Sequence, residues 1–226
     1  MKNKACDAII LAAGKSSRFQ HSEAKQYLRI NNISLVDIAI NNLISFKSIK
    51  NLYIVLQKDS KFKSSLKLSN IKYIRGGLTR TKSVYNALKY IKDTQEIPDN
   101  ILVHDAARPY IENKDLKNLL SFSNSLKNGY ALGYPLTNAL KKVDKNFVVK
   151  ENLNRDNLFM ALTPQLYNFN KLYSCYNAIN EKKINVDDEI EAMAFLSYKV
   201  NILFSSIGNI KLTYKEDQKI LKKLLK

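Results

Sequence analysis

Short apolar runs alternate with amphipathic stretches along most of this chain, and this alternation constrains the fold more strongly than any other feature of the sequence. The apolar runs predict buried strands at residues 7–11, 52–56, 71–74, 101–103, 131–134 and 200–204. The amphipathic stretches predict helices at residues 35–46, 81–91, 116–126, 169–179, 189–198 and 214–225. Such alternation is typical of an α/β fold, so we expect a Rossmann-like, mainly parallel sheet with helices on both faces.

One segment interrupts the alternation. Residues 136–157 (LTNALKKVDKNFVVKENLNRDN) contain β-branched pairs and polar residues without a helical period, which predicts an extended arm or hairpin that protrudes from the sheet. The 226 residues contain no internal repeat, low-complexity tract or Gly/Ser linker. We therefore expect a single domain over residues 1–226 with one protruding β-arm.

The charge balance bears on the possible partners. The 37 Lys and Arg residues against 20 Asp and Glu residues give a formal charge of +17, which is compatible with a nucleic-acid or acidic-membrane ligand. The lysines are nevertheless scattered, and Lys, Asn and Ile are used heavily throughout. We interpret most of the excess as compositional drift, and we expect no nucleic-acid and no membrane partner.

Cysteine usage and hydropathy bear on the compartment. Cys6 and Cys175 cannot form a disulfide framework and belong to no Cys/His cluster typical of structural zinc, so both are expected to be small buried residues. The apolar run at residues 8–13 is too short to span a bilayer and does not resemble a signal-peptide cleavage region. The expected location is the cytoplasm.

Small residues and cations follow the first predicted strand. In open parallel sheets, ligands bind at the carboxyl ends of strands, so this is where site residues are expected. Ala12, Ala13 and Gly14 let a backbone approach a ligand closely, and Arg18 and Lys25 follow at a separation that a loop could fold around a polyphosphate. The loop matches neither the Walker A motif nor the dinucleotide fingerprint, and a solvated surface loop explains it equally well.

A second cluster, RGGLTRTKS, follows the third predicted strand. Its paired glycines, Gly76 and Gly77, are compatible with a simple turn. They are equally compatible with backbone N–H groups presented to the edge of a base, beside a helix N-terminus near Ser83 that tolerates an anion.

A third cluster, HDAARP, stands where a buried strand is predicted to end. Asp105 could hold a metal or a ribose hydroxyl, and the Arg108 guanidinium offers a fork for phosphate oxygens. The structural alternative is an internal ion pair between Asp105 and Arg108, with His104 merely packed. The position at a strand end favours the functional interpretation.

Seven motifs together carry a family resemblance: LAAGKSSRF, AKQYL, GGLTRTKSV, HDAARP, NRDNLFMALTPQ, VDDEIEA and NIKLT. From about Ala8 to the C-terminal helix, their order and approximate spacing resemble the 2-C-methyl-D-erythritol 4-phosphate cytidylyltransferases of the non-mevalonate isoprenoid pathway. HDAARP and ALTPQ are the specific motifs, whereas AAG with a downstream Arg and Lys is shared with many sugar-phosphate nucleotidyltransferases.

The resemblance implies that this nucleotidyltransferase domain transfers the cytidylyl group from CTP to methylerythritol phosphate. The substrate's phosphate oxygen would attack the α-phosphorus of CTP in line and expel pyrophosphate, giving 4-diphosphocytidyl-2-C-methyl-D-erythritol. By the family pattern, Arg18 and Lys25 would stabilise the α-phosphate and the leaving group, and Lys211 would help to hold the attacking phosphate. Mg²⁺ would bind through the CTP phosphates, with no side-chain metal site expected.

The resemblance also implies binding residues. Those around the cytidine would be Ala12, Ala13, Gly14, Gly77 and Ser83. Those on the substrate side would be Asp105, Arg108, Arg155, Thr163, Asp187 and Thr213. In this family the arm exchanges between two subunits, so the resemblance predicts a homodimer in which Arg155 reaches the partner's methylerythritol phosphate.

Several positions depart from the family pattern. Asn138-Ala139 replaces the usual Asp-Thr, Leu78 and Lys82 replace acidic residues, and Asp187 stands where a Thr is often found. These departures leave open a cytidylyltransferase of the same fold that acts on a pentitol phosphate such as ribitol 5-phosphate. A catalytically silent relative that binds RNA through its basic surface is the alternative from another class.

Overall fold

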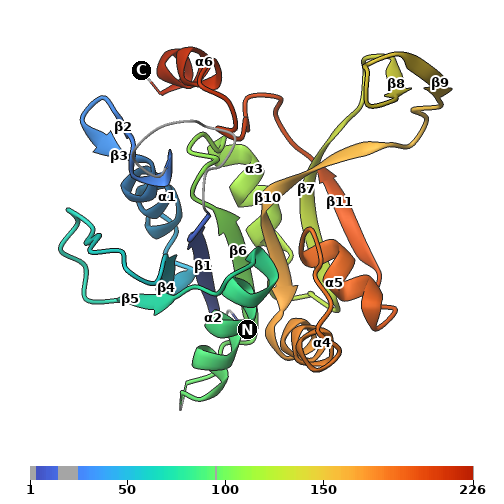
Figure 1. The fold of residues 1–226 in the computed structure, drawn as a ribbon. Coiled ribbons are helices and arrows are strands. Elements are labelled where there is room, and N and C mark those ends of the chain that lie inside the picture. The colour runs from blue at the N-terminus through green and yellow to red at the C-terminus, as the bar shows by residue number, and fades with distance from the viewer. Residues whose placement is uncertain (1–3, 15–24, 95, 226) are drawn as a thin grey trace.

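A mixed sheet forms the centre of the chain in the computed structural model, which describes residues 4–14, 25–94 and 96–225 (Figure 1). Seven strands lie in the order β11-β7-β10-β6-β1-β4-β5. Their bounds are β1 Cys6–Ala12, β4 Ile49–Leu56, β5 Ile71–Arg75, β6 Asn100–Asp105, β7 Gly129–Pro135, β10 Phe159–Asn168 and β11 Val200–Phe204. All neighbouring strands are parallel except β10, which runs antiparallel to β6 and to β7. The expected mainly parallel sheet is thus confirmed.

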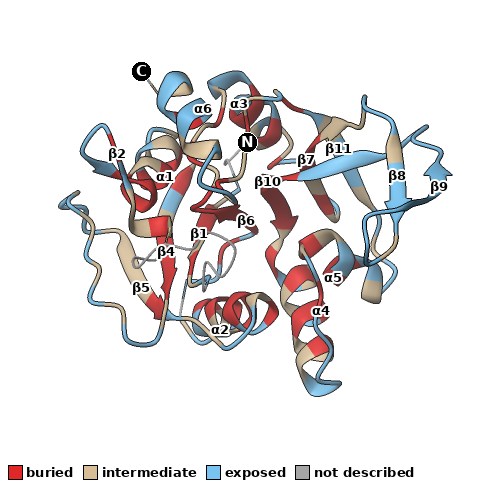
Figure 2. Ribbon diagram, turned by 45° about the horizontal axis from the view of Figure 1, so that its top comes forward, coloured by how far each residue is buried: buried red, intermediate tan, exposed pale blue. Residues whose placement is uncertain are grey.

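Helices cover both faces of this sheet, as expected. The helices are α1 Leu35–Ile44, α2 Arg80–Lys92, α3 Asn113–Ser121, α4 Phe169–Glu181, α5 Glu189–Phe195 and α6 Asp217–Leu224. The apolar side chains of α1 and α3 pack on one face, and those of α2, α4 and α5 pack on the other (Figure 2). Successive residues of β1 alternate between these two cores, because Ile10 belongs to the first and Ile9 to the second. No helix among the described residues is long and apolar enough to cross a membrane.

Strand β10 is the one strand of the seven-stranded sheet that the sequence prediction missed. A proline in a candidate strand argues against a central position, and Pro164 lies in the middle of this one. The strand tolerates the proline because the register to β7 shifts between Leu162 and Gln165, so that the proline needs no ladder hydrogen bond. The same shift takes Thr163 out of the ladder, and its hydroxyl accepts a hydrogen bond from the backbone N–H of Asp105.

The expected arm contains a two-stranded antiparallel hairpin that lies outside the central sheet. Its strands are β8 (Leu140–Val143) and β9 (Val149–Leu153), and Figure 1 shows it projecting from the body of the molecule. Every residue of β9 is exposed. A smaller hairpin of β2 (Arg29–Ile30) and β3 (Ile33–Ser34), which the sequence did not predict, precedes α1.

Three predicted helices differ from the structure by three residues or more at one or both ends, and the other three by one or two residues. The helix expected at residues 116–126 spans Asn113–Ser121, because the turn that Phe122 begins ends it before Leu126. The helix expected to reach Tyr198 ends at Phe195, where Ser197 adopts a left-handed backbone with φ of 59°. The last helix begins at Asp217 rather than Tyr214, because the Asp217 carboxylate accepts hydrogen bonds from the N–H groups of residues 213 and 214.

Candidate active site

The candidate site lies at the topological switch point of the sheet, where the order of successive strands reverses. Strand β1 has β4 on one side and β6 on the other, and β6 follows β5 in the sequence, so the order reverses beside β1. Ligands of open α/β sheets bind at such a switch point, beyond the carboxyl ends of the strands. Leu11 of β1 pairs with Asp105 of β6, so the predicted first and third clusters end side by side.

The backbone after β1 is held by two glutamine side chains. Gln26 is buried and donates from Nε2 to the carbonyl oxygens of Ala12, at 2.9 Å, and Gly14, at 3.0 Å. Gln57 at the end of β4 donates to the same Gly14 oxygen, also at 3.0 Å. These bonds tie Gln26 and Gln57 to the backbone that ends at Gly14. The predicted cation Arg18 lies outside the described residues. Neither glutamine was predicted from the sequence, although Gln26 lies in the AKQYL motif.

Lys25 joins this loop to the far end of the chain. It begins the short 3₁₀ helix Lys25–Tyr27, and its Nζ donates to the Leu212 carbonyl oxygen at 2.6 Å. Leu212 follows Lys211, so the structure brings two of the three predicted catalytic cations to neighbouring positions. The Thr213 hydroxyl donates to the Lys211 carbonyl oxygen at 3.1 Å, which stabilises this second segment locally.

The glycine pair after β5 packs directly against the loop after β1. A Cβ atom on Gly76 would lie 2.6 Å from the Ala13 Cβ and 3.0 Å from the Leu56 carbonyl oxygen, so a larger residue does not fit without movement. The Gly77 N–H donates to the Ser83 hydroxyl at 3.0 Å, and that hydroxyl donates to the Thr79 carbonyl oxygen at 2.8 Å. The buried Ser83 therefore orders the glycine turn.

A pocket of about 490 Å³ opens beside this turn. It is lined by Ala13, Tyr27, Gln57, Lys58, Asp59, Ser60, Arg75, Gly76, Gly77 and Leu78. Two predicted nucleotide-binding residues, Ala13 and Gly77, thus share its wall. Leu78, which stands where the family pattern has an acidic residue, is 88% exposed.

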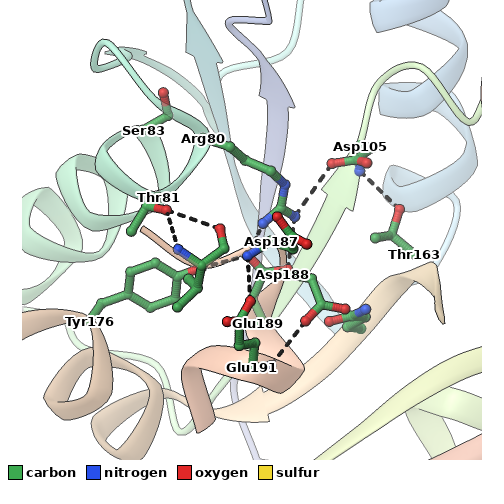
Figure 3. Close-up of polar contacts among 12 residues, drawn as sticks. Arg80, Thr81, Ser83, Asp105, Thr163, Tyr176, Asp187, Asp188, Glu189 and Glu191 are labelled. Carbon is green, nitrogen blue, oxygen red and sulfur yellow. Dashed lines mark hydrogen bonds and ion pairs between the residues drawn. The ribbon is translucent and has the colours of Figure 1, made fainter. Parts of the chain in front are cut away.

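Asp105 is a carboxylate of the site that pairs with two cations. Its Oδ2 lies 2.6 Å from the Lys211 Nζ. Its Oδ1 lies 3.5 Å from the Arg80 Nη2 (Figure 3). Burial opposes ionisation of this carboxyl, but Arg80 and Lys211 hold its pKa well below the usual range. Among the described residues, its ion pairs are with these two cations rather than with Arg108, so the internal Asp105–Arg108 pair considered from the sequence is not formed.

Arg80 is a site residue that sequence reasoning missed. Its Nη1 and Nη2 lie 2.8 Å and 2.9 Å from the two carboxylate oxygens of Glu189, which is fully buried and also accepts a hydrogen bond from the Tyr176 hydroxyl (Figure 3). A signal did exist in the sequence. Arg80 opens α2, and a cation in the first turn of a helix is unfavourable beside the helix dipole unless a nearby anion compensates it.

His104 is packed, as the structural alternative proposed. Its side chain is fully buried, its Nδ1 lies 3.1 Å from the Thr163 hydroxyl, and burial lowers its pKa to about 4. Because Thr163 accepts from the Asp105 N–H, its own hydroxyl proton is available to the imidazole. Thr163 therefore links His104 to Asp105, and its contact with substrate stays a prediction.

Arg108 is held by backbone carbonyl groups. Its Nη1 donates to the Asn209 oxygen at 2.8 Å and its Nη2 to the Ala161 oxygen at 3.4 Å. Burial lowers the pKa of this guanidinium, and Asp105 opposes that effect. The Asn209 side chain in turn donates to the Thr163 carbonyl oxygen, so Arg108 is anchored to the same bulge of β10.

Two predicted substrate residues lie apart from this network. Asp187 is exposed just before α5, and its backbone N–H donates to a carboxylate oxygen of Glu191 at 2.7 Å (Figure 3). Arg155 is exposed in the turn between β9 and β10, and its side chain has no hydrogen bond or ion pair with another described residue. The structure of one chain therefore does not bring Arg155 to the other site residues.

Comparisons with known proteins agree on one family. Residues 6–226 match the family model IspD, 2-C-methyl-D-erythritol 4-phosphate cytidylyltransferase. A relative of that name from Fusobacterium nucleatum subsp. nucleatum is 34% identical over 221 residues, covering 95% of this chain and 94% of the relative. One from Wigglesworthia glossinidia brevipalpis is 36% identical over 212 residues, covering 92% and 90%. A crystal structure of the Francisella tularensis enzyme of that name superposes with a TM-score of 0.83 at 27% identity, covering 97% and 99%.

Proposed function

The chain belongs to the 2-C-methyl-D-erythritol 4-phosphate cytidylyltransferase family, and we propose that it carries out the family's reaction with the residues that meet at the switch point of the sheet. The enzyme transfers the cytidylyl group from CTP to 2-C-methyl-D-erythritol 4-phosphate in isoprenoid precursor biosynthesis. It is therefore a nucleotidyltransferase, and its catalysis depends on how the chain positions two phosphorylated substrates and stabilises the charge between them.

The observation that carries the proposed mechanism is the convergence of Lys25 and Lys211. Lys25 is held by the carbonyl of Leu212, and Lys211 is ion-paired with Asp105, so both ammonium groups lie at the carboxyl ends of β1 and β6. We assign Lys25, together with Arg18, to the α-phosphate and the departing pyrophosphate. We assign Lys211 to the phosphate of the attacking alcohol phosphate. Fixed cations at these positions stabilise charge that develops in the transition state, so no nucleophilic side chain is needed.

The pocket beside Gly77 is the proposed location of the cytidine. The tight approach of Gly76 to Ala13 brings the two backbone segments of the pocket wall together, and Ser83 fixes the turn. We propose that Ala12, Ala13, Gly14, Gly77 and Ser83 contact the nucleotide. Asp105, Arg108, Thr163, Asp187 and Thr213 are assigned to the side of the alcohol phosphate.

Mg²⁺ is the proposed cofactor, held chiefly by phosphate oxygens of CTP. The chemistry at the end of β6 fits this arrangement, because Asp105 is already paired with Arg80 and Lys211, which leaves phosphate oxygens as the main ligands on offer to the ion. When bound, the ion neutralises charge on the triphosphate and on the leaving pyrophosphate. Removing divalent ions with EDTA should abolish pyrophosphate release, and added Mg²⁺ should restore it. Full activity in EDTA would exclude the ion.

We propose that the arm pairs two copies of the chain. Apolar side chains that are exposed on the arm and at the start of β10 need a partner surface in water. They are Val143, Phe147, Val148, Val149, Leu153, Leu158, Phe159 and Met160, with Phe147 exposed by 86%. A second copy would cover this surface and supply Arg155 to a site that lacks it in the single chain.

Location is a separate proposal. Cys6 and Cys175 are both free and buried, which is in keeping with a reducing compartment. We propose the cytoplasm.

A turnover assay tests the function directly. Purified enzyme is given Mg²⁺ and CTP with either methylerythritol phosphate or ribitol 5-phosphate, and pyrophosphate release is measured. We expect kcat/KM to be higher with methylerythritol phosphate by about 10²-fold or more, because even a difference of one carbon group between two substrates is worth about 10- to 200-fold. A higher kcat/KM with ribitol 5-phosphate would show that ribitol 5-phosphate, and not methylerythritol phosphate, is the substrate. Release from neither would leave the silent, RNA-binding relative as the explanation.

A further inference from the structure

We propose that Arg80 is a positioning residue for the transfer, because it holds the Asp105 carboxylate in the orientation from which Lys211 meets the alcohol phosphate. The inference rests on the substrate-side roles proposed above for Asp105 and Lys211. It adds a residue to which neither the sequence pattern nor those roles assigned a part in the reaction.

The Arg80 guanidinium lies between two carboxylates from different elements. Both of its terminal nitrogens are bound by Glu189 at the start of α5, at 2.8 Å and 2.9 Å. Its Nη2 also reaches the Asp105 Oδ1 at the end of β6, at 3.5 Å. Figure 3 shows Arg80 extending from α2 toward both partners. Its paired nitrogens are therefore committed to protein anions, which fits a supporting role better than direct phosphate binding.

The two carboxylates differ in their access to solvent. The Glu189 side chain is fully buried and receives a further hydrogen bond from the Tyr176 hydroxyl at 2.9 Å. The Asp105 side chain is 11% exposed, and the Lys211 side chain bound to it is 38% exposed. Glu189 thus anchors the guanidinium from inside the core, and Asp105 receives its outer edge. Glu189 in the core therefore positions Arg80, and Arg80 positions Asp105 at the site.

The charges around Asp105 explain why this support matters. The groups that face it are Arg80 from α2, Lys211 from the segment after β11, and Arg108 from the loop after β6, with neutral His104 on its own strand. If Arg80 were absent, Lys211 would be the remaining direct ion-pair partner of the carboxylate. Asp105 would then be free to turn toward Lys211, and this ammonium group would be less available to an incoming phosphate.

Arg80 can be substituted without releasing α2 from the segment before α5, because other contacts hold the two together. The Thr81 hydroxyl donates to the Val186 carbonyl oxygen, and the Val186 N–H donates to the Thr81 hydroxyl, both at 3.0 Å (Figure 3). The cost expected from Arg80→Gln alone is the unpaired, buried Glu189 carboxylate. The double variant Arg80→Gln/Glu189→Gln removes that charge and retains amides that can hydrogen-bond.

The experiment compares Arg80→Gln, the double variant and Arg80→Lys with the wild type and with Lys89→Gln, which removes an exposed cation from the same helix. For each protein, Tm, the Kd for CTP, and kcat/KM for methylerythritol phosphate are measured. We expect the double variant to regain most of the Tm lost by Arg80→Gln. Its kcat/KM should stay about 10- to 100-fold below wild type, the size of a positioning defect, with the Kd for CTP changed less than about threefold.

A second comparison asks whether Arg80 acts through Asp105. In an Asp105→Asn background, the double substitution should lower kcat/KM by less than about threefold further, because the group that it positions is already altered. Recovery of kcat/KM together with Tm in the double variant would show that Arg80 is merely structural and overturn the inference. So would an equal loss of CTP affinity, or a full additional loss in the Asp105→Asn background.

Arg80→Lys keeps the test decisive if the double variant does not fold. Lysine preserves the charge over Glu189 but cannot bind both of its oxygens and Asp105 together. We expect Arg80→Lys to lose less Tm than Arg80→Gln, because the charge over Glu189 is kept, and to lose kcat/KM for methylerythritol phosphate. Full activity would overturn the inference. Failure of the function itself would show separately, as a wild type that releases no pyrophosphate from CTP and methylerythritol phosphate.

Discussion

At the scale of single residues, the site is a set of charges that compensate one another at the sheet edge. Asp105 and Glu189 are buried carboxylates, and Arg80 contacts both of them. Lys211 completes the set on the solvent side through its 2.6 Å contact with Asp105. A buried carboxylate is costly unless cations pair with it, so each member of the set stabilises the others in the folded state.

His104 gives a testable pH dependence at this scale. Burial holds its pKa at about 4, against an ordinary value of 6.5, so the folded protein keeps the imidazole neutral while the unfolded chain takes up a proton. Stability contributed by the neutral imidazole is therefore complete above pH 6.5 and is lost as the pH falls toward about 4. The loss should reach about 3 kcal/mol in the free energy of unfolding.

Urea unfolding of the wild type and of His104→Gln between pH 7.5 and 4.5 measures this effect. Both proteins share every other titrating group, so the difference between their pH profiles isolates His104. The wild type should lose more stability than the variant across this interval. Parallel profiles would mean that the imidazole is charged in the folded protein or accessible to water.

Sequence patterns predicted some of these residues and missed others. The positions of Asp105 and Gly77 followed from their place after apolar runs, because the carboxyl ends of parallel strands share one edge of a sheet. The ion-pair partners of Asp105 did not follow, since Arg80 and Lys211 come from segments whose meeting depends on tertiary packing. The same holds for Glu189, which binds Arg80 from α5. Gln26 was missed for the same reason, because its acceptors are backbone carbonyls that no sequence pattern marks.

At the scale of elements, β10 and the arm determine what one chain can do alone. The bulge of β10 at Thr163-Pro164 connects Asp105, His104 and Arg108 through hydrogen bonds to Thr163 and its neighbours. No strand was predicted at residues 159–168, and the proline in their middle is a residue that central strands normally exclude. The arm was predictable from its lack of helical period, but the pairing of β8 with β9 and the exposure of β9 depend on the fold.

Subunit mixing tests the proposed exchange of the arm. Arg155→Ala and Lys25→Ala chains should each be nearly inactive, yet a heterodimer would hold one site with both an intact Lys25 and the other chain's Arg155. Random re-association of equal amounts should then restore about a quarter of the wild-type rate. The unmixed variants, treated in the same way, are the control. Absence of any recovery would mean that Arg155 does not work across the subunit interface.

At the scale of the whole molecule, the charge of +17 alone would suggest a nucleic-acid-binding protein. A protein that binds single-stranded nucleic acid needs exposed aromatic rings among its cations. Tyr53 is 1% exposed and Tyr85 is 8% exposed, so these aromatic residues serve the core. Lys63 and Lys82 lie over tyrosine rings of the protein itself. The basic composition is therefore compatible with an enzyme of small phosphorylated substrates.

The corresponding prediction concerns RNA affinity. At physiological salt we expect the Kd for a single-stranded RNA oligonucleotide to be about 10 µM or weaker, as for non-specific electrostatic binding. Fluorescence anisotropy across a range of salt concentrations measures it, with CTP turnover recorded on the same preparation. Submicromolar binding that persists at physiological salt would contradict the interpretation of the charge as drift.

Two ends of the chain together complete the proposed catalytic site, with Lys25 beside Leu212 and Lys211 beside Asp105. The most direct test is kcat for pyrophosphate release by Lys25→Ala at saturating CTP, Mg²⁺ and methylerythritol phosphate. Lys47→Ala, which removes an exposed lysine outside the site, is the matched control and should behave as wild type. We predict that Lys25→Ala lowers kcat by about 10²-fold or more, the loss seen when one transition-state stabiliser is removed. A kcat within about threefold of wild type would contradict the assignment of Lys25 to the chemical step.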